Sequence, residues 1–233
     1  MDYQHQWING NVIALPVGQV YCVGRNYAAH AAELNNPLPE QPVIFIKPPS
    51  AIQPLGHSLT LAEKFAPVHF ETELAVLITQ PLYEATPSEV QSGLGAMALG
   101  LDLTRRDQQS YLKAQGLPWE RAKAFAGSAL LTPFMATPKN WDDVFFSLAI
   151  NGELRQQGHT AHMMTSVVSL IAHMSDTFPL RPGDVVFTGT PEGVGPLANG
   201  DKLTLRLGKC DLGETRVVYA SSSVDNHGNN AAR

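Results

Sequence analysis

The sequence predicts a mainly β fold with a few helices, which places it in the α+β class. Its 233 residues include 19 glycines and 17 prolines, and these separate short apolar runs, as expected for strands joined by turns. Residues 144–150 and 153–157 flank Asn151-Gly152, the strongest hairpin signal in the chain. Apolar residues recur at helical spacing between 162 and 178, which predicts one amphipathic helix packed on the core.

The N-terminal half predicts a strand at 20–23, a short helix at 27–34 with Asn26 as its N-cap, and a second strand at 43–47. Residues 51–67 are rich in turn formers and predict an irregular segment. The strand predicted at 68–79 is apolar on both faces beyond its acidic start, as in a strand buried on both sides.

The second half begins with Thr86-Pro87-Ser88-Glu89, a capping box with proline in the first turn of a helix. The apolar run 96–103 predicts a buried strand that carries one charge, Asp102. Thr104 is the expected cap of the helix that follows, at 105–115. The remaining predicted strands span residues 184–188, 202–207 and 214–219. We expect a single catalytic domain, residues 1–220, and a flexible polar tail, residues 221–233.

Composition excludes several classes of protein. With 44% hydrophobic and 16% charged residues, the chain can bury a substantial core. A net charge of −5 and the lack of a basic block argue against a nucleic-acid partner. Its apolar runs are too short to span a membrane, and we expect no signal peptide. Cys22 and Cys210 lack zinc or disulfide spacing, so we expect buried thiols and a cytoplasmic location.

Three acidic side chains are candidate metal ligands. Glu71 and Glu73 alternate with other residues on one strand and therefore share a face. Two carboxylates at the mouth of a buried strand repel each other unless a cation lies between them, and a divalent ion with oxygen ligands would meet this need. Asp102 would add a third oxygen ligand. The alternative is an edge strand with a solvated acidic end.

Several other polar residues occupy positions that suit a site. His30 and Glu33 are three apart on the predicted helix, as in a general acid–base dyad or an exposed pair of little consequence. Arg106 and Gln109 share a helix face in the same way. Lys123 lies among apolar residues, which suits a snorkelling side chain or a fixed cation. Lys47 ends a strand, where a lysine is either solvated or in contact with substrate.

Seven segments, in order between about residues 20 and 200, together resemble the fumarylacetoacetate hydrolase family. The chain is most similar to the small single-domain branch of acylpyruvases and oxaloacetate decarboxylases. The segments are VYCVGRNYAAHAAEL, PVIFIKPPS, VHFETELAVLI, GLDLTRRDQQ, PWERAKAF, INGELRQQG and PGDVVFTGTPEGVGPL.

The resemblance implies a mixed β-sandwich roll, assembled as a homodimer, with Mg²⁺ or Mn²⁺ on the three acidic residues. It also implies a catalytic dyad on a helix that closes over a small 2-oxo acid. The site residues it implies are Glu71, Glu73 and Asp102 for the metal; His30, Glu33 and Lys123 for catalysis; and Arg25, Lys47, Arg106, Gln109 and Thr190 for the substrate.

These expectations favour a Mg²⁺-dependent hydrolase that cleaves the C–C bond of acylpyruvate-type 2,4-dioxo acids through a metal-stabilised pyruvate enolate. The alternative is an oxaloacetate decarboxylase or tautomerase, or an isomerase of an unsaturated 2-oxo diacid, because each of these reactions passes through the same enolate. A non-catalytic binding module would be favoured by loss of a ligand or of the dyad, and the sequence retains both.

Overall fold

The computed structural model describes residues 3–221, so the predicted tail, 221–233, lies outside the described residues apart from Ser221. Within that range the chain forms a seven-stranded, a five-stranded and a two-stranded sheet. The larger sheet contains, in spatial order, β2 (Val43–Lys47), β1 (Val20–Gly24), β11 (Val185–Phe187), β6 (Thr72–Ile78), β7 (Leu94–Asp102), β8 (Ala129–Leu131) and β3 (Ile52–Pro54).

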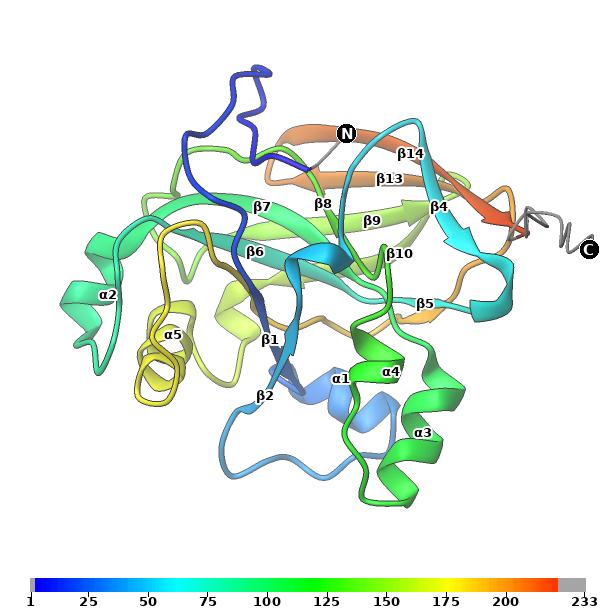
Figure 1. Ribbon diagram of the computed structural model, residues 1–233, viewed down its shortest axis with the longest axis horizontal. Helices are drawn as coiled ribbons and strands as arrows, with labels where there is room; N and C mark the ends of the chain where they lie inside the picture. The colour runs from blue at the N-terminus through cyan, green and yellow to red at the C-terminus, as the bar shows by residue number, and fades with distance from the viewer. Residues whose placement is uncertain (1–2, 222–233) are drawn as a thin grey trace, which may run out of the picture.

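The second layer is the five-stranded sheet, which lies over β6 and β7 (Figure 1). Its strands, in spatial order, are β10 (Glu153–His159), β9 (Phe145–Ile150), β13 (Lys202–Leu207), β14 (Cys210–Ala220) and β4 (Ser58–Ala62). The small sheet pairs β12 (Gly195–Pro196) with β5 (His69–Phe70). This two-layer, mainly β arrangement confirms the predicted fold class.

The core lies on both faces of the larger sheet. Leu74 and Val76 of β6 point into the cluster shared with the five-stranded sheet, whereas Ala75 and Leu77 join a second cluster on the opposite face. Every residue of β6 is buried. The prediction of a strand buried on both sides is therefore confirmed from Leu74 onward.

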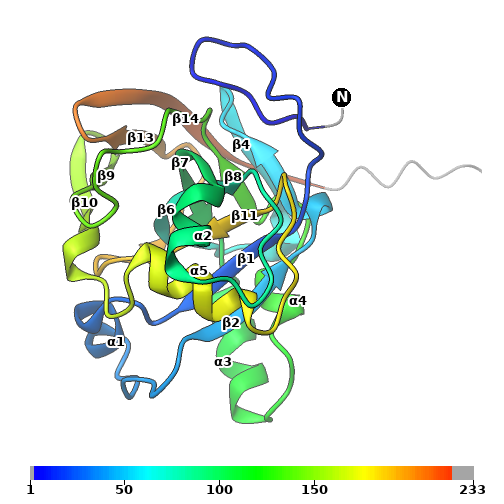
Figure 2. The same cartoon turned by 90° about the vertical axis from the view of Figure 1, so that its left-hand side faces the viewer.

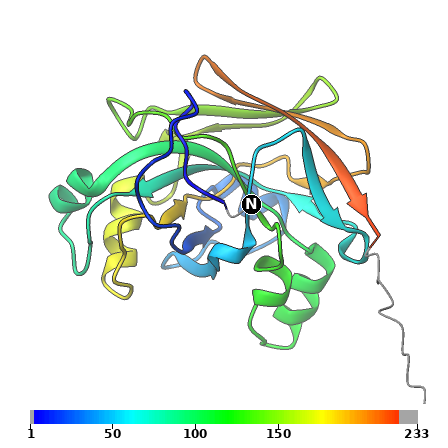
Figure 3. The same cartoon turned by 45° about the horizontal axis from the view of Figure 1, so that its top comes forward.

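The helices lie at two places on this framework. The described helices are α1 (Ala28–Glu33), α2 (Pro87–Gly93), α3 (Arg106–Ala114), α4 (Glu120–Lys123) and α5 (Val167–Ser175). Helices α2 and α5 pack together at one end of the sheets (Figure 2). Helices α3 and α4 pack together on the side of the molecule opposite β13 and β14 (Figure 3). Within residues 3–221, no helix has both the length and the apolarity needed to cross a membrane.

Several local predictions are confirmed. The side chain of Thr86 accepts a hydrogen bond from the Glu89 N–H, and the Glu89 carboxylate accepts one in return, so α2 has the expected capping box. The hairpin β9–β10 turns at Asn151 and Gly152, whose φ angles of 54° and 86° suit the predicted tight turn.

Four local predictions are wrong. The strand predicted at 68–79 is interrupted at Glu71, because β5 pairs with β12 whereas β6 pairs with β7 and β11. Residues 51–67 are not irregular throughout, since they contain β3 and β4, which pair in parallel with β8 and β14. Asn26 and Thr104 do not cap the helices that follow them, because their side chains are bonded elsewhere.

Candidate active site

One edge of the larger sheet brings together segments that are far apart in the sequence. Because β6 and β7 are antiparallel, the start of β6 lies beside the end of β7, and Thr72 pairs with Leu101. β1 and β11 also end at this edge, since β11 is antiparallel to β6 and β1 is parallel to β11. Helix α1 follows β1, and α3 follows β7. The acidic start of β6 therefore faces both helices and the Gly-rich loop after β11, residues 189–195.

The three predicted metal ligands converge at this edge. Glu71, Glu73 and Asp102 are all buried, and each offers a carboxylate oxygen within 4.8 Å of the others. Glu73 also accepts a hydrogen bond from the Gly189 N–H at the start of the Gly-rich loop. The alternative of a solvated acidic strand end is wrong, because these side chains are almost fully removed from solvent.

Cations surround the carboxylates. The ammonium of Lys123 lies 2.9 Å from Glu71 Oε2 and 2.6 Å from Asp102 Oδ2, and it also donates to the Thr104 hydroxyl. Arg106 donates from Nη2 to the other oxygen of Glu71. Lys123 is therefore a fixed cation rather than a snorkelling side chain.

Lys47 has a different position from the one expected of a substrate contact. Its side chain is fully buried, with Nζ 2.8 Å from Asp102 Oδ1. The same ammonium donates to the carbonyls of Leu103, Ser128 and Lys123. Lys47 is not among the residues that line the cavity described below. This arrangement supports Asp102 from behind instead of facing a substrate.

The charges shift the pKa values of the carboxyls in opposite directions. Burial acts to raise the pKa of Glu71, but Lys123 and Arg106 outweigh it and hold this pKa well below its usual range. Burial, together with Asp102 and Glu71, raises the pKa of Glu73 well above its usual range. Burial acts to lower the pKa of Lys123, yet Asp102 and Glu71 leave it raised, so Lys123 stays an ammonium.

The donor set suits a divalent cation. Three carboxylates offer only oxygen ligands, which Mg²⁺ and Mn²⁺ prefer. Asp102 Oδ1 lies close to Lys47 Nζ but outside hydrogen-bonding geometry, so this buried oxygen keeps a free lone pair. A divalent ion would also relieve the repulsion that raises the pKa of Glu73. The residues present therefore fit a metal ion.

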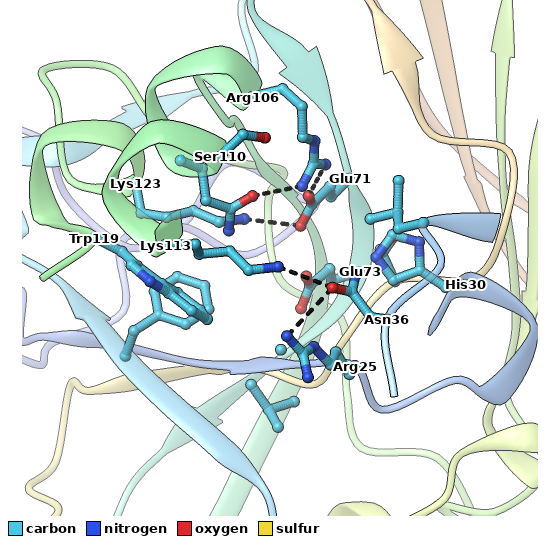
Figure 4. A pocket seen from close by; sticks show the side chains of 16 residues that line it. Arg25, His30, Asn36, Glu71, Glu73, Arg106, Ser110, Lys113, Trp119 and Lys123 are labelled. Carbon is cyan, nitrogen blue, oxygen red and sulfur yellow. Dashed lines mark hydrogen bonds and ion pairs between the residues drawn. The ribbon is translucent and has the colours of Figure 1, made fainter. Parts of the chain in front are cut away.

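A cavity of about 230 Å³ opens beside the carboxylates (Figure 4). Its size suits a small metabolite, since pockets for drug-sized ligands are usually larger. The predicted site residues that line it are Arg25, His30, Glu71, Glu73, Arg106, Gln109, Lys123 and Thr190. Asp102, Glu33 and Lys47 are not part of this lining.

The histidine and glutamate of α1 form the expected pair. His30 is 5% exposed, and its Nδ1 lies 3.4 Å from Glu33 Oε2. The other carboxylate oxygen of Glu33 accepts a 3.0 Å hydrogen bond from the Gly193 N–H. This bond joins α1 to the Gly-rich loop and fixes the carboxylate behind the imidazole. A distance of 3.4 Å is long for a hydrogen bond but common for dyads without substrate.

Two of the predicted substrate contacts are held by neighbours. Gln109 Oε1 accepts a 2.7 Å hydrogen bond from Arg106, which fixes the guanidinium beside Glu71. Thr190 donates from its hydroxyl to the Thr72 carbonyl and accepts from Gln156. Gln156 is 1% exposed and also accepts from the Thr72 N–H. Gln156 therefore ties β10 to both the acidic strand and the Gly-rich loop.

Sequence reasoning missed Gln156, Lys113, Asn36 and Trp119. Gln156 lies in a hairpin strand with polar neighbours, and nothing in that pattern distinguishes it. Lys113 had a usable signal, because it follows Arg106 by seven residues and so lies on the same face of α3. Lys113, Asn36 and Trp119 all line the cavity.

A two-layer β fold that holds a buried trio of carboxylates beside a small, cation-lined cavity has the features of an enzyme active site. The chain belongs to the fumarylacetoacetate (FAA) hydrolase family, whose C-terminal domain description matches residues 19–218. It is an enzyme of that superfamily, whose relatives include tautomerases, hydrolases and isomerases.

Three relatives illustrate the range of activities. The chain is 47% identical over 219 residues to oxaloacetate tautomerase YcgM of Escherichia coli K12, covering 93% of this chain and all of that protein. A structure of a fumarylacetoacetate hydrolase family protein from Yersinia pestis CO92 is 42% identical, with a TM-score of 0.90 over 93% of this chain and all of that one. Fumarylpyruvate hydrolase from Pseudomonas aeruginosa, solved with Mn²⁺ and pyruvate, is 34% identical, with a TM-score of 0.85 over 94% and 97% of the two chains.

Proposed function

We propose that this protein is an oxaloacetate tautomerase, which interconverts the keto and enol forms of oxaloacetate with the help of Mg²⁺ or Mn²⁺. The observation that carries the proposal is the buried carboxylate trio beside a small cavity that His30 and several cations line. The 47% identity to an oxaloacetate tautomerase over its whole length supports this activity over acylpyruvate hydrolysis, the first expectation from the sequence.

Tautomerisation removes a proton from C3 of oxaloacetate and adds one to the oxygen on C2. Glu71, Glu73 and Asp102 would hold the metal ion, which when bound polarises the C2 carbonyl and favours the enolate. Arg106 and Lys123 bring positive charge to the same place and orient the anionic substrate. Both remain in position because Glu71 fixes them.

His30 moves the proton in this proposal. We assign the proton of His30 to Nδ1, where Glu33 accepts it, so that Nε2 is free to take a proton from C3 and deliver one to the oxygen on C2. The hydrogen bond from Gly193 holds the Glu33 carboxylate in place for this task. General acid–base help of this kind is typically worth ~10²–10⁴-fold in rate.

Acylpyruvate hydrolysis is the second candidate. The same dyad could take a proton from water instead of from C3, and water would then attack the C4 carbonyl. The specific observation in its favour is the likeness to a fumarylpyruvate hydrolase with a TM-score of 0.85. The homodimer stays a prediction from the resemblance, and the cytoplasmic location stays a prediction from the two cysteines.

Product analysis separates the candidates. The Mn²⁺-loaded protein is mixed with enol oxaloacetate, loss of the enol absorbance is followed, and pyruvate is measured separately. We expect rapid enol loss with little added pyruvate, and slow cleavage of acetylpyruvate. Faster cleavage of acetylpyruvate would favour the hydrolase.

A pair of histidine variants tests the role of the dyad. His30→Ala should slow tautomerisation by roughly 10²-fold or more, because the proton then has no positioned carrier. His57→Ala is the matched control, since His57 is exposed and does not line the cavity. A wild-type rate in His30→Ala would show that another group carries the proton.

A further inference from the structure

Two of the cations that line the cavity have no acidic partner among the described residues. Arg25 and Lys113 both line the cavity, and within residues 3–221 neither lies within 4.0 Å of a carboxylate. Both donate to the same neutral acceptor, the amide oxygen of Asn36, at 3.3 Å and 2.8 Å (Figure 4). Arg106 and Lys123, in contrast, are each paired with Glu71. The cavity therefore has one group of cations that the acidic trio neutralises and another that nothing in its lining neutralises.

The fold brings these three residues together from separate segments. Arg25 directly follows β1 and has a φ angle of 63°, a conformation that costs a non-glycine residue free energy and is often kept at functional sites. Asn36 lies in the loop after α1. Lys113 lies in the last turn of α3 on the same face as Arg106. Lysines are common at the C-terminal ends of helices because they complement the helix dipole. This preference does not explain why Lys113 lines the cavity or why it shares an acceptor with Arg25.

The electrostatics of this cluster favour an anion. Burial, Arg25 and Arg106 all act to lower the pKa of Lys113, which shows that the ammonium is placed among like charges. The acceptors of these cations are the Asn36 amide oxygen and, for Arg25 alone, the Pro37 carbonyl, and neither acceptor carries a full negative charge. A carboxylate has two oxygens and a full negative charge, and it could accept from both side chains at once.

Building on the proposed function, we propose that Arg25, Asn36 and Lys113 form a subsite for the second carboxylate of a short dicarboxylic 2-oxo acid. The acidic trio, Arg106 and Lys123 would serve the 2-oxo acid end, and the substrate's remote carboxylate would replace the Asn36 oxygen as the shared acceptor. The subsite then selects four-carbon diacids such as oxaloacetate over 2-oxo acids with an uncharged end. A cavity of about 230 Å³ suits so short a substrate.

The test compares two ligands that differ in this carboxylate alone. Oxaloacetate has it, and pyruvate shares the 2-oxo acid end but lacks it. With the Mn²⁺-loaded protein, we measure KM and kcat for oxaloacetate and the inhibition constant of pyruvate. Lys113→Gln and Arg25→Gln should each raise the KM for oxaloacetate roughly tenfold or more, as expected for the loss of a charged hydrogen bond. The inhibition constant of pyruvate should change by less than about twofold, since pyruvate does not reach the subsite.

Further variants sharpen the comparison. Asn36→Asp places a fixed carboxylate between the two cations, so it should weaken oxaloacetate binding and leave pyruvate binding unchanged. Lys113→Arg keeps the charge and should keep most of the affinity. Lys139→Gln is the matched control, because Lys139 is exposed and lies outside the cavity lining. Thermal melts of all variants check that the fold is intact.

The outcomes distinguish the subsite from the function on which it rests. Unchanged oxaloacetate kinetics in Lys113→Gln and Asn36→Asp, with wild-type tautomerase activity present, would overturn the subsite alone. Equal weakening of pyruvate and oxaloacetate would also overturn it, because the lysine would then support the whole site. If the wild-type protein does not act on oxaloacetate at all, both the proposed function and the subsite are wrong.

Discussion

The buried contact between Lys47 and Asp102 makes a prediction about stability that the structure allows us to quantify. Lys47→Met keeps the length and apolar volume of the side chain but removes its charge. Asp102 then loses one of its two cations, although Lys123 still contacts its other oxygen at 2.6 Å. The carbonyl of Leu103 loses its donor as well, whereas the Ser128 carbonyl keeps the Leu103 N–H. We expect Lys47→Met to fold but to be clearly less stable than the wild type.

The size of the effect follows from the geometry. Two unit charges 2.8 Å apart attract by about 6 kcal/mol at an effective dielectric constant of about 20. The cost of desolvating the ammonium offsets part of this, and breaking a buried ion pair typically costs about 3–5 kcal/mol. Because Lys123 still partly compensates Asp102, we expect a loss near the lower end, about 3 kcal/mol.

Urea unfolding measures this loss, and a double-mutant cycle assigns it to the ion pair. The cycle compares Lys47→Met, Asp102→Asn and the double variant. The double variant should lose at least about 2 kcal/mol less than the sum of the single variants, because it no longer leaves one charge alone. A loss below about 1 kcal/mol in Lys47→Met, or strictly additive losses, would refute the role given to Lys47.

Three further predictions concern pH, packing and metal. Burial lowers the pKa of His5 below its usual 6.5, so the unfolded chain takes up a proton first as the pH falls, and the free energy of unfolding should decrease below about pH 6.5. In urea titrations, His5→Gln should make the free energy of unfolding depend less on pH in this range. An unchanged pH dependence would contradict the role given to His5. A Cβ on Gly100 would lie 2.2 Å from the Phe187 ring, so Gly100→Ala should lower the free energy of unfolding by about 1–3 kcal/mol or more. Gly56 has open space around it, so Gly56→Ala should change the free energy of unfolding by no more than about 0.5 kcal/mol in the same assay. Mn²⁺ at 100 times its Kd should stabilise the protein by about 2.7 kcal/mol, and a melting temperature that a chelator leaves unchanged would count against a metal site.

The sequence predicted those elements whose signal is local. Asn151-Gly152 predicts the hairpin because few other residue pairs adopt its tight turn easily. Thr86 and Glu89 predict the capping box because their contacts lie within one helical turn. Helix α5 follows from its apolar spacing, although it is shorter than predicted because only Val167–Ser175 is helical. In each case the residues that determine the structure lie within a few positions of one another.

The failures occur where distant segments decide the structure. β4 is a strand because β14, more than 150 residues away, offers it a parallel edge, and no pattern within 51–67 reports that pairing. Asn26 could have capped α1, but its amide oxygen instead accepts from the Thr165 N–H, and its amide nitrogen donates to the carbonyls of Thr165 and Thr188. Thr104 could have capped α3, but its hydroxyl accepts from Lys123. A capping residue is a local option, and tertiary contacts with better geometry displace it.

The site shows the same limit most clearly in its lysines. Lys47, Lys113 and Lys123 each lie in the last turn or at the end of a short element, and this position does not show which groups each ammonium contacts. The structure separates them by what faces each ammonium: Asp102 and carbonyls for Lys47, two carboxylates for Lys123, and a single amide oxygen for Lys113. Lys47 and Lys123 each have a carboxylate partner without a ligand, whereas Lys113 has only a neutral acceptor for its full positive charge. Of these lysines, Lys113 is therefore the one whose surroundings a negatively charged substrate group would improve most.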